Sequence, residues 1–166
     1  MSMAISSVSD REQKKKRIIT LVLMAIFLMS ASFFLIDRKV ETIIIVSFPN
    51  GRELETEVAD TPEKLLFGLA FRETLPMNSG MLYIFESTGQ NHIWTKEYRF
   101  PVDVIWIDES HHVVGLKEYI DPCREDDCPR YSSSPKAVRY ALQTEAGFIK
   151  REGVTIGLEL KYTLRM

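Results

Sequence analysis

The feature that most constrains this chain is an uncharged run of 19 residues near its N-terminus, Ile18 to Ile36. Only Thr20, Ser30 and Ser32 interrupt the apolar character of this run. Roughly 20 apolar residues suffice for a helix to span the hydrocarbon core of a bilayer. We therefore expect residues 18–36 to form one transmembrane helix that anchors the chain in a membrane.

Positive charges flank this run unequally, with five cations closely before it and two after it. They are Arg11, Lys14, Lys15, Lys16 and Arg17 before the run, and Arg38 and Lys39 after it. The positive-inside rule then makes residues 1–17 a cytoplasmic tail and residues 38–166 an exported domain. The expected location is the cytoplasmic membrane, crossed once, with the C-terminal domain outside the cytoplasm.

A cleaved signal peptide is the alternative to a permanent signal anchor. Ser30-Ala31-Ser32 offers the small residues of a cleavage site. The apolar run continues past that site through residues 33–36, as a segment that stays in the membrane requires. The sequence therefore favours the anchor and leaves cleavage open.

The exported part is acidic. Without residues 1–36, the chain keeps 16 Lys or Arg against 21 Asp or Glu. Binding to a nucleic-acid backbone needs a basic face, so nucleic acid is not an expected partner. The simplest role of this charge is to keep a domain soluble beside the membrane.

Alternating hydrophobicity predicts a β-rich domain. It opens with a hairpin of residues 40–48 and 52–59, joined by the Asn50-Gly51 turn. Thr61 and Pro62 then favour the start of a short helix to about Ala70, and Gly153 ends a second one that begins at Ala146.

About seven short strands and these two helices indicate a mainly β (α+β) fold. We expect a small antiparallel domain, barrel-like or a sandwich, preceded by the transmembrane helix.

The stretch from His92 to Asp108 has two different halves. Residues 102–107 are β-branched or aromatic apart from Asp103, which is typical of a mostly buried strand. The preceding half mixes aromatic and polar residues. A strand there would place Trp94, Lys96 and Tyr98 on one face.

An aromatic platform beside charged groups suits a sugar or another planar polar ligand. We therefore take Trp94, Lys96, Tyr98, Arg72 and Asp103 as candidate binding residues. The structural alternative is that Trp94 covers the core, Lys96 extends along it, and Asp103 pairs with Arg72 or Arg99.

Separated motifs of the exported part resemble the bacterial and archaeal family known as domain of unknown function 192. They are Phe67-Gly68-Leu69-Ala70-Phe71-Arg72-Glu73-Thr74-Leu75-Pro76, Gly80–Phe85, Trp94-Thr95-Lys96, Phe100–Asp108, Val138–Leu142 and Ala146-Gly147-Phe148. The resemblance implies a small exported or membrane-anchored domain of mostly β fold, and it carries no established activity. Members usually read Trp-Met-Lys-Asn-Thr where this chain has Trp94-Thr95-Lys96-Glu97-Tyr98.

Cys123 and Cys128 are the only cysteines, in a long polar segment between residues 121 and 136. Outside the cytoplasm they are most simply a disulfide. Their spacing differs from that of thioredoxin-like catalysts, and a zinc site would need further ligands. The resemblance also covers the prolines beside both cysteines. We expect no metal and no cofactor.

No nucleophile elbow, metalloprotease helix or phosphate loop occurs in the sequence. The expected role is therefore binding or structural, with an envelope polysaccharide or a partner protein as the ligand. The alternative is a hydrolase or lyase that acts on envelope glycans with Asp103 as acid or base. The sequence leaves catalysis undecided and favours binding.

Overall fold

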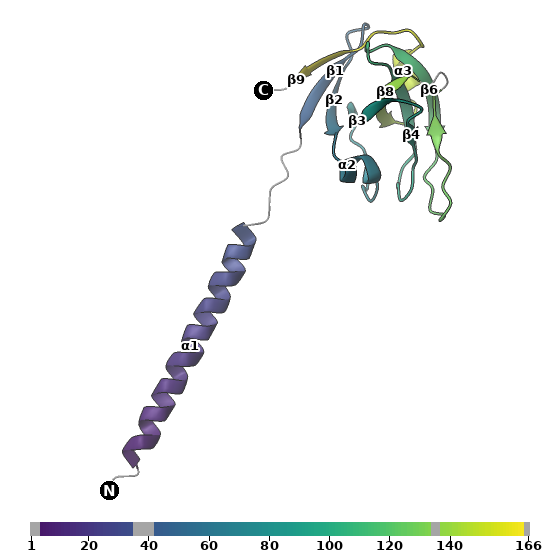
Figure 1. The fold of residues 1–166 in the computed structure, drawn as a ribbon. Helices are drawn as coiled ribbons and strands as arrows, with labels where there is room; N and C mark the ends of the chain where they lie inside the picture. The colour runs from purple at the N-terminus through teal and green to yellow at the C-terminus, as the bar shows by residue number, and fades with distance from the viewer. Residues whose placement is uncertain (1–3, 35–41, 134–136, 165–166) are drawn as a thin grey trace. The chain divides into compact units, whose positions relative to one another are not determined.

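A computed structural model describes residues 4–34, 42–133 and 137–164 of the chain. These residues fall into two compact units, Met1–Val40 and Glu41–Met166. The first unit contains a single helix, α1 (Ala4–Phe34), and the second contains every described strand and two short helices (Figure 1).

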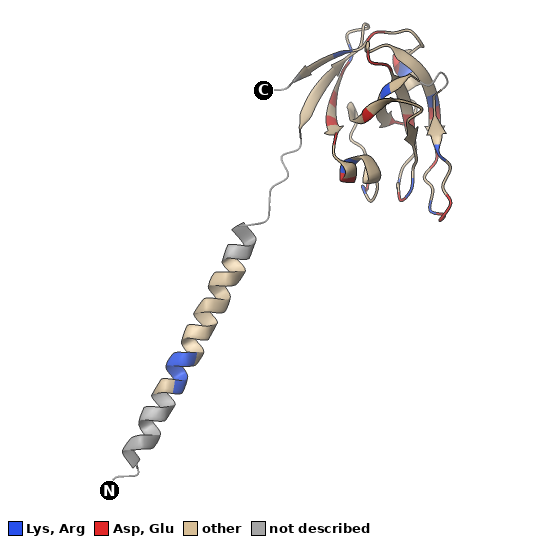
Figure 2. Cartoon of the chain, viewed as in Figure 1, with Lys and Arg blue, Asp and Glu red and all other residues tan. Residues whose placement is uncertain are grey.

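Helix α1 carries its described cations in one band, Lys14 to Arg17, followed by uncharged turns (Figure 2). The apolar side chains after the band are exposed. Among the residues that the structure describes, no helix is both long and apolar enough to cross a membrane. The predicted anchor at 18–36 extends to positions 35 and 36, which lie outside the described residues.

The second unit is built on one sheet of seven strands in the order β6-β5-β8-β3-β2-β1-β9. The strands are β1 (Ile43–Ser47), β2 (Glu53–Ala59), β3 (Ser79–Gly89), β5 (Val102–Ile107), β6 (Val113–Ile120), β8 (Val138–Glu145) and β9 (Lys161–Leu164). Two further strands, β4 (His92–Ile93) and β7 (Tyr131–Ser132), pair with each other. The prediction of a mainly β domain with two short helices is confirmed.

The sheet is mainly antiparallel, as the sequence predicts, and it contains one parallel pair. Strands β2 and β3 are neighbours and run parallel, with Thr56 opposite Gly80. Helix α2 (Pro62–Phe67) lies in the connection between them. A parallel pair needs such a crossover, because a tight turn can only reverse the chain.

The sheet is open and curved rather than two packed sheets (Figure 1). Its two edge regions approach each other at one end. His112 and Glu159 form an isolated bridge there, and the backbone N–H of Val113 donates to the carbonyl of Leu158 at 2.9 Å. These contacts join the start of β6 to the segment before β9.

Both faces of the sheet are covered by apolar side chains. On one face, Ile105 and Leu142 pack with Phe148 of α3 (Phe148–Glu152). On the other, Trp106 and Tyr83 pack with residues that follow α2. All six residues of β5 are buried, as the sequence predicts. The face covered by the α2 region carries the candidate site.

Candidate functional site

Helix α2 ends where it meets the sheet. The side chain of Thr61 accepts a hydrogen bond from the backbone N–H of Lys64 at 3.3 Å and caps the first turn. Gly68 ends the helix with a φ of 51°. A Cβ atom at Gly68 would lie 1.8 Å from the hydroxyl oxygen of Tyr83, so only glycine allows this close approach.

A buried polar network lies beneath this helix end. The hydroxyls of Tyr83 and Tyr98 donate to Oε1 of Gln143 at 2.6 and 2.8 Å. The backbone N–H of Leu69 donates to the Tyr98 hydroxyl at 3.3 Å. Burial raises the pKa of both tyrosine hydroxyls above the usual value for tyrosine, and the rise is large for Tyr83. Both side chains therefore present neutral phenols to their surroundings.

The cysteine loop forms one wall of the site. Cys123 and Cys128 are joined by a disulfide, which confirms the predicted pairing. Hydrogen bonds join the region of Cys123 to the segment that follows β4. The side-chain hydroxyl of Thr95 in that segment donates to the carbonyl of Asp121 at 2.8 Å. The backbone of Cys123 also exchanges hydrogen bonds with Thr95 (3.0 Å) and Glu97 (2.9 Å). The disulfide loop thereby fixes the path of residues 95–97.

Trp94 connects the three parts of the site. Its indole N–H donates to the carbonyl of Leu66 in α2 at 3.2 Å. The guanidinium of Arg130, two residues after Cys128, lies 5.8 Å from the centre of the indole ring. This distance is within the range of a cation–π contact. Trp94 is half-buried, so part of its ring remains open to a ligand.

Two pockets of about 220 Å³ each adjoin this indole. The first, which we call the aromatic pocket, is lined by Leu65, Leu66, Tyr83, His92, Ile93, Trp94, Tyr98 and Arg130. The second, the rim pocket, is lined by Leu66, Phe67, Ala70, Phe71, Trp94, Lys96 and Glu97. Leu66 and Trp94 contribute to both walls, so the pockets are neighbours.

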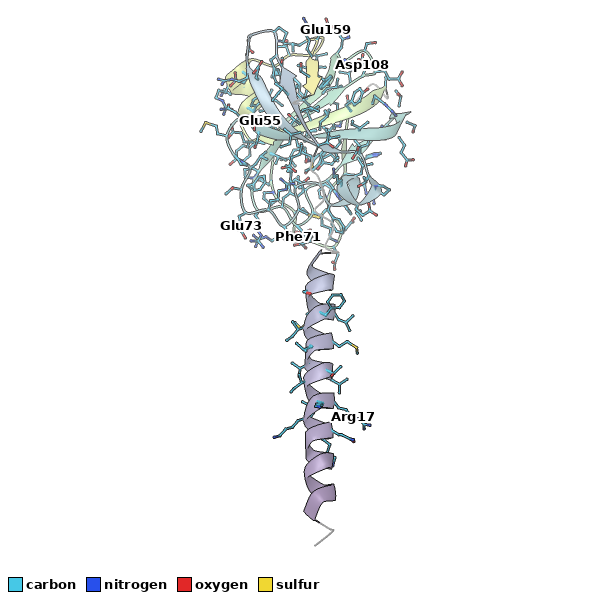
Figure 3. All side chains as sticks on the ribbon, turned by 90° about the vertical axis from the view of Figure 1, so that its left-hand side faces the viewer. Arg17, Glu55, Phe71, Glu73, Asp108 and Glu159 are labelled. Carbon is cyan, nitrogen blue, oxygen red and sulfur yellow. A yellow bond between two sulfur atoms is a disulfide. The ribbon has the colours of Figure 1, made fainter. Side chains whose placement is uncertain are left out.

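A third, more polar hollow of about 590 Å³ shares residues with both and is lined by Phe71, Glu73, Glu97, Tyr98, Arg99 and Arg124. Arg99 and Glu73 form an ion pair there. Phe71 and Glu73 lie at the opposite end of the domain from Asp108 and Glu159 (Figure 3). The three hollows therefore gather at one end of the domain.

The structure brings three of the five predicted binding residues together. Trp94 and Tyr98 line the aromatic pocket, and Trp94 and Lys96 line the rim pocket. They do not share the face of a strand, because residues 94–99 are irregular. Tyr98 turns inward and is only 2% exposed.

The other two predicted residues have different partners from those expected. Arg72 binds Glu57 of β2 through two contacts of 2.5 and 2.6 Å, and it lines none of the three hollows. Asp103 is fully buried. Its two carboxylate oxygens accept hydrogen bonds from the backbone N–H groups of Tyr119 (2.8 Å) and Ile149 (2.9 Å). Neither Arg72 nor Arg99 pairs with Asp103 in the described part of the chain.

This placement bears on the catalytic alternative. An acid or base must come within hydrogen-bond reach of the substrate proton. The carboxylate of Asp103 is inaccessible and ties the edge strand β6 and helix α3 to β5. Its geometry is that of a structural group, and this argues against a hydrolase or lyase that uses Asp103.

Several residues of the pockets were not predicted from the sequence, chiefly Arg130, Tyr83 and the apolar side chains of α2. Arg130 follows the second cysteine closely, and the expected disulfide loop was the only signal for it. Tyr83 reads as an ordinary core residue of a strand. Nothing in the sequence indicates that the side chains of Arg130 and Tyr83 line the same pocket as Trp94.

A small mixed sheet with a cluster of pockets at one end defines the architecture, and comparison with known proteins defines the family. The family model described as "Uncharacterized ACR", that of domain of unknown function 192, matches residues 45–162. The chain belongs to this family, which confirms the resemblance seen in the sequence. No protein of curated function matches the chain.

Two solved structures are similar to this one. One is a Sinorhizobium meliloti protein whose name proposes a role as a transcription regulator, with 26% identity and a TM-score of 0.63 over 74% of this chain and 94% of its own. The other is a Novosphingobium aromaticivorans protein of unknown function, with 20% identity and a TM-score of 0.63 over 72% of this chain and 83% of its own. The second shows the fold alone.

Proposed function

We propose that this protein is a binding protein whose ligand enters the aromatic pocket beside Trp94. The observation that carries the proposal is the position of the indole, which forms a wall of two adjoining pockets and is held by a hydrogen bond to Leu66. A fixed, half-exposed aromatic ring supplies contact area at little cost in conformational entropy.

The composition of the aromatic pocket supports this role. Apolar side chains and three aromatic rings make most of its lining, and His92 and Arg130 supply polar groups. Ligand sites of this kind combine an apolar wall with a few fixed polar groups that set orientation. The ligand we favour is one sugar unit of an envelope polysaccharide or a side chain of an envelope protein.

The rim pocket extends the binding surface outward. Leu66, Phe67 and Phe71 are each more than half exposed, at 53, 52 and 58%. Exposed apolar side chains that gather in one place often mark a binding surface. We propose that a longer ligand continues from the aromatic pocket across these three residues.

We further propose that residues 18–36 anchor the chain in the cytoplasmic membrane, with the C-terminal domain outside. The support is the uncharged run and the cations before it. The Cys123–Cys128 disulfide fits an oxidising compartment. A reporter enzyme active only outside the cytoplasm, fused after Met166, should be active. Its activity should be lost when residues 18–36 are deleted, and activity of the deleted form would contradict the proposal.

A role in transcription, proposed by name for the Sinorhizobium protein, has less support for this chain. Residues 37–166 carry more Asp and Glu than Lys and Arg. DNA binding gains most of its affinity from neutralised phosphates and therefore needs a basic face.

A thermal-shift screen of sugars, cell-wall fragments and small organic acids tests the proposed binding role. A ligand that binds only the folded protein raises its melting midpoint. We expect at least one class to raise the midpoint of the wild type and not of Trp94→Ala. The control is Tyr119→Ala, because Tyr119 is 64% exposed and lines none of the three hollows. Equal shifts in wild type and Trp94→Ala would place the site elsewhere.

A further inference from the structure

We propose that the part of the ligand that enters the aromatic pocket is a single ring that carries a carboxylate, and that Arg130 binds this carboxylate. The inference rests on the proposed binding role and specifies the chemistry of the ligand.

The side chains that line the aromatic pocket carry positive charge and no negative charge. None of the eight described residues that line the aromatic pocket is acidic, and Arg130 is a permanent cation among them. His92 adds ring nitrogens that can donate hydrogen bonds. The neighbouring hollows differ, because Lys96 is accompanied by Glu97 in the rim pocket, and acids accompany the arginines of the third hollow. The aromatic pocket therefore favours an anion.

Arg130 is positioned for this contact and has no carboxylate partner within the described ranges. Its recorded contact is the face of the Trp94 ring. Its backbone is held by the adjacent pairing of Tyr131 with Ile93 and by the disulfide loop before it. A guanidinium that lies over an aromatic ring keeps its N–H groups in its own plane, where they can still bind both oxygens of a carboxylate.

The size of the cavity limits the rest of the ligand. A cavity of about 150 Å³ in another protein is large enough to bind benzene. The aromatic pocket, at about 220 Å³, has room for one six-membered ring with a carboxylate. Leu65 and Ile93 provide an apolar contact for the ring face.

Two sources supply this chemistry: an aromatic acid, and an acidic sugar such as a uronic acid unit of a polysaccharide. Both place a carboxylate on a single ring. Two matched pairs of probes separate the charge from the ring: benzoate with benzamide, and glucuronate with glucose. In each pair the neutral member keeps the ring and lacks the negative charge.

The test measures dissociation constants of these four probes for the full-length chain by ligand-observed NMR. We expect at least one acid to bind about five- to tenfold more tightly than its neutral partner, since a charge-assisted pair at a partly exposed site contributes about 1 kcal/mol. Arg130→Met should remove this preference, because it keeps an apolar stem without the charge. Arg130→Lys should retain part of it. The pair that shows the preference identifies the source.

Equal binding of acid and neutral members would overturn the carboxylate assignment and leave the binding role standing. An acid preference that survives in Arg130→Met would overturn the role of Arg130. Absence of binding by all four probes would also overturn the inference. The proposed function itself fails only if the broader screen yields no ligand that depends on Trp94.

Discussion

Phe71 and Glu97 face each other across the mouth of the site, and both have left-handed backbone conformations. Their φ angles are 64° and 59°, and the backbone N–H of Phe71 donates to the carbonyl of Glu97 at 2.9 Å. Bulky residues rarely adopt such angles, which cost about 1–3 kcal/mol each and are concentrated at functional sites. Asparagine tolerates this backbone conformation better than glutamate does.

We predict that Glu97→Asn stabilises the fold by about 0.5 to 1 kcal/mol, because it relieves this strain. The free energy of unfolding from denaturant titration measures the effect. Glu125→Asn is the matched control, because Glu125 is exposed and is absent from the positive-φ residues. An equal gain in the control, or none at Glu97, would show that the backbone angle is not the cause.

Removal of the disulfide should weaken ligand binding as well as stability. The Cys123–Cys128 bridge closes a short loop. When both cysteines are changed to serine, the gain in chain entropy of the unfolded state should lower the free energy of unfolding by about 2 kcal/mol. The backbone of Cys123 also holds Thr95 and Glu97 by hydrogen bonds, and Arg130, which contacts the indole, follows Cys128 by two residues. We expect affinity to fall even at temperatures where the variant is fully folded. Unchanged affinity in the folded double variant would mean that the loop does not shape the pocket.

Asp103→Asn should destabilise the fold and leave affinity unchanged. The asparagine oxygen can replace only one of the two acceptors, so the N–H of either Tyr119 or Ile149 loses its partner, at a cost of about 1–3 kcal/mol. Asp127→Asn, at an exposed position, is the control and should change little. A variant as stable as the wild type but altered in ligand affinity would reopen a direct functional role for Asp103.

Alkaline pH should destabilise the domain through its buried tyrosines. Burial raises the pKa of Tyr83 and Tyr98, so the folded state holds protons that the unfolded chain releases near pH 10. Their contribution to stability is complete below about pH 10 and is lost as the pH rises above it. Phenolate absorbance should therefore appear later in the folded protein than in denaturant, and Tyr83→Phe should lessen the loss. Ionisation of all six tyrosines near the usual pH in the folded state would contradict this account.

Local patterns predicted the parts of the fold that depend on neighbouring residues. The first hairpin forms around Asn50 and Gly51 as expected, with the N–H of Phe48 bonded to the carbonyl of Arg52. The parallel pairing of β2 with β3 could not be predicted this way, because it depends on which strands meet after α2. Alternation shows which face of a strand is buried and says nothing about its neighbour.

Local patterns also fail to reveal contacts between distant segments at the candidate site, so only some of its residues were predicted. Trp94 was recognisable because a tryptophan among polar residues is unusual. Asp103 was also recognisable as the one acid in a buried strand. The hydrogen-bond partners of Asp103 could not be predicted. They are backbone N–H groups of β6 and α3, which every residue except proline carries, so no residue type in the sequence indicates them. Arg130 reaches Trp94 only through the pairing of β4 with β7, which are two residues long each.

The most direct test of the proposed site uses the indole N–H resonances of the two tryptophans in the isotope-labelled protein. Trp94 donates this proton to Leu66 beside both pockets, whereas Trp106 is buried and its Nε1 has no partner among the described residues. A ligand that raises the melting midpoint should shift the Trp94 resonance in a saturable way and affect that of Trp106 far less. A stabilising ligand that leaves the Trp94 resonance in place would show that the aromatic pocket is not the binding site.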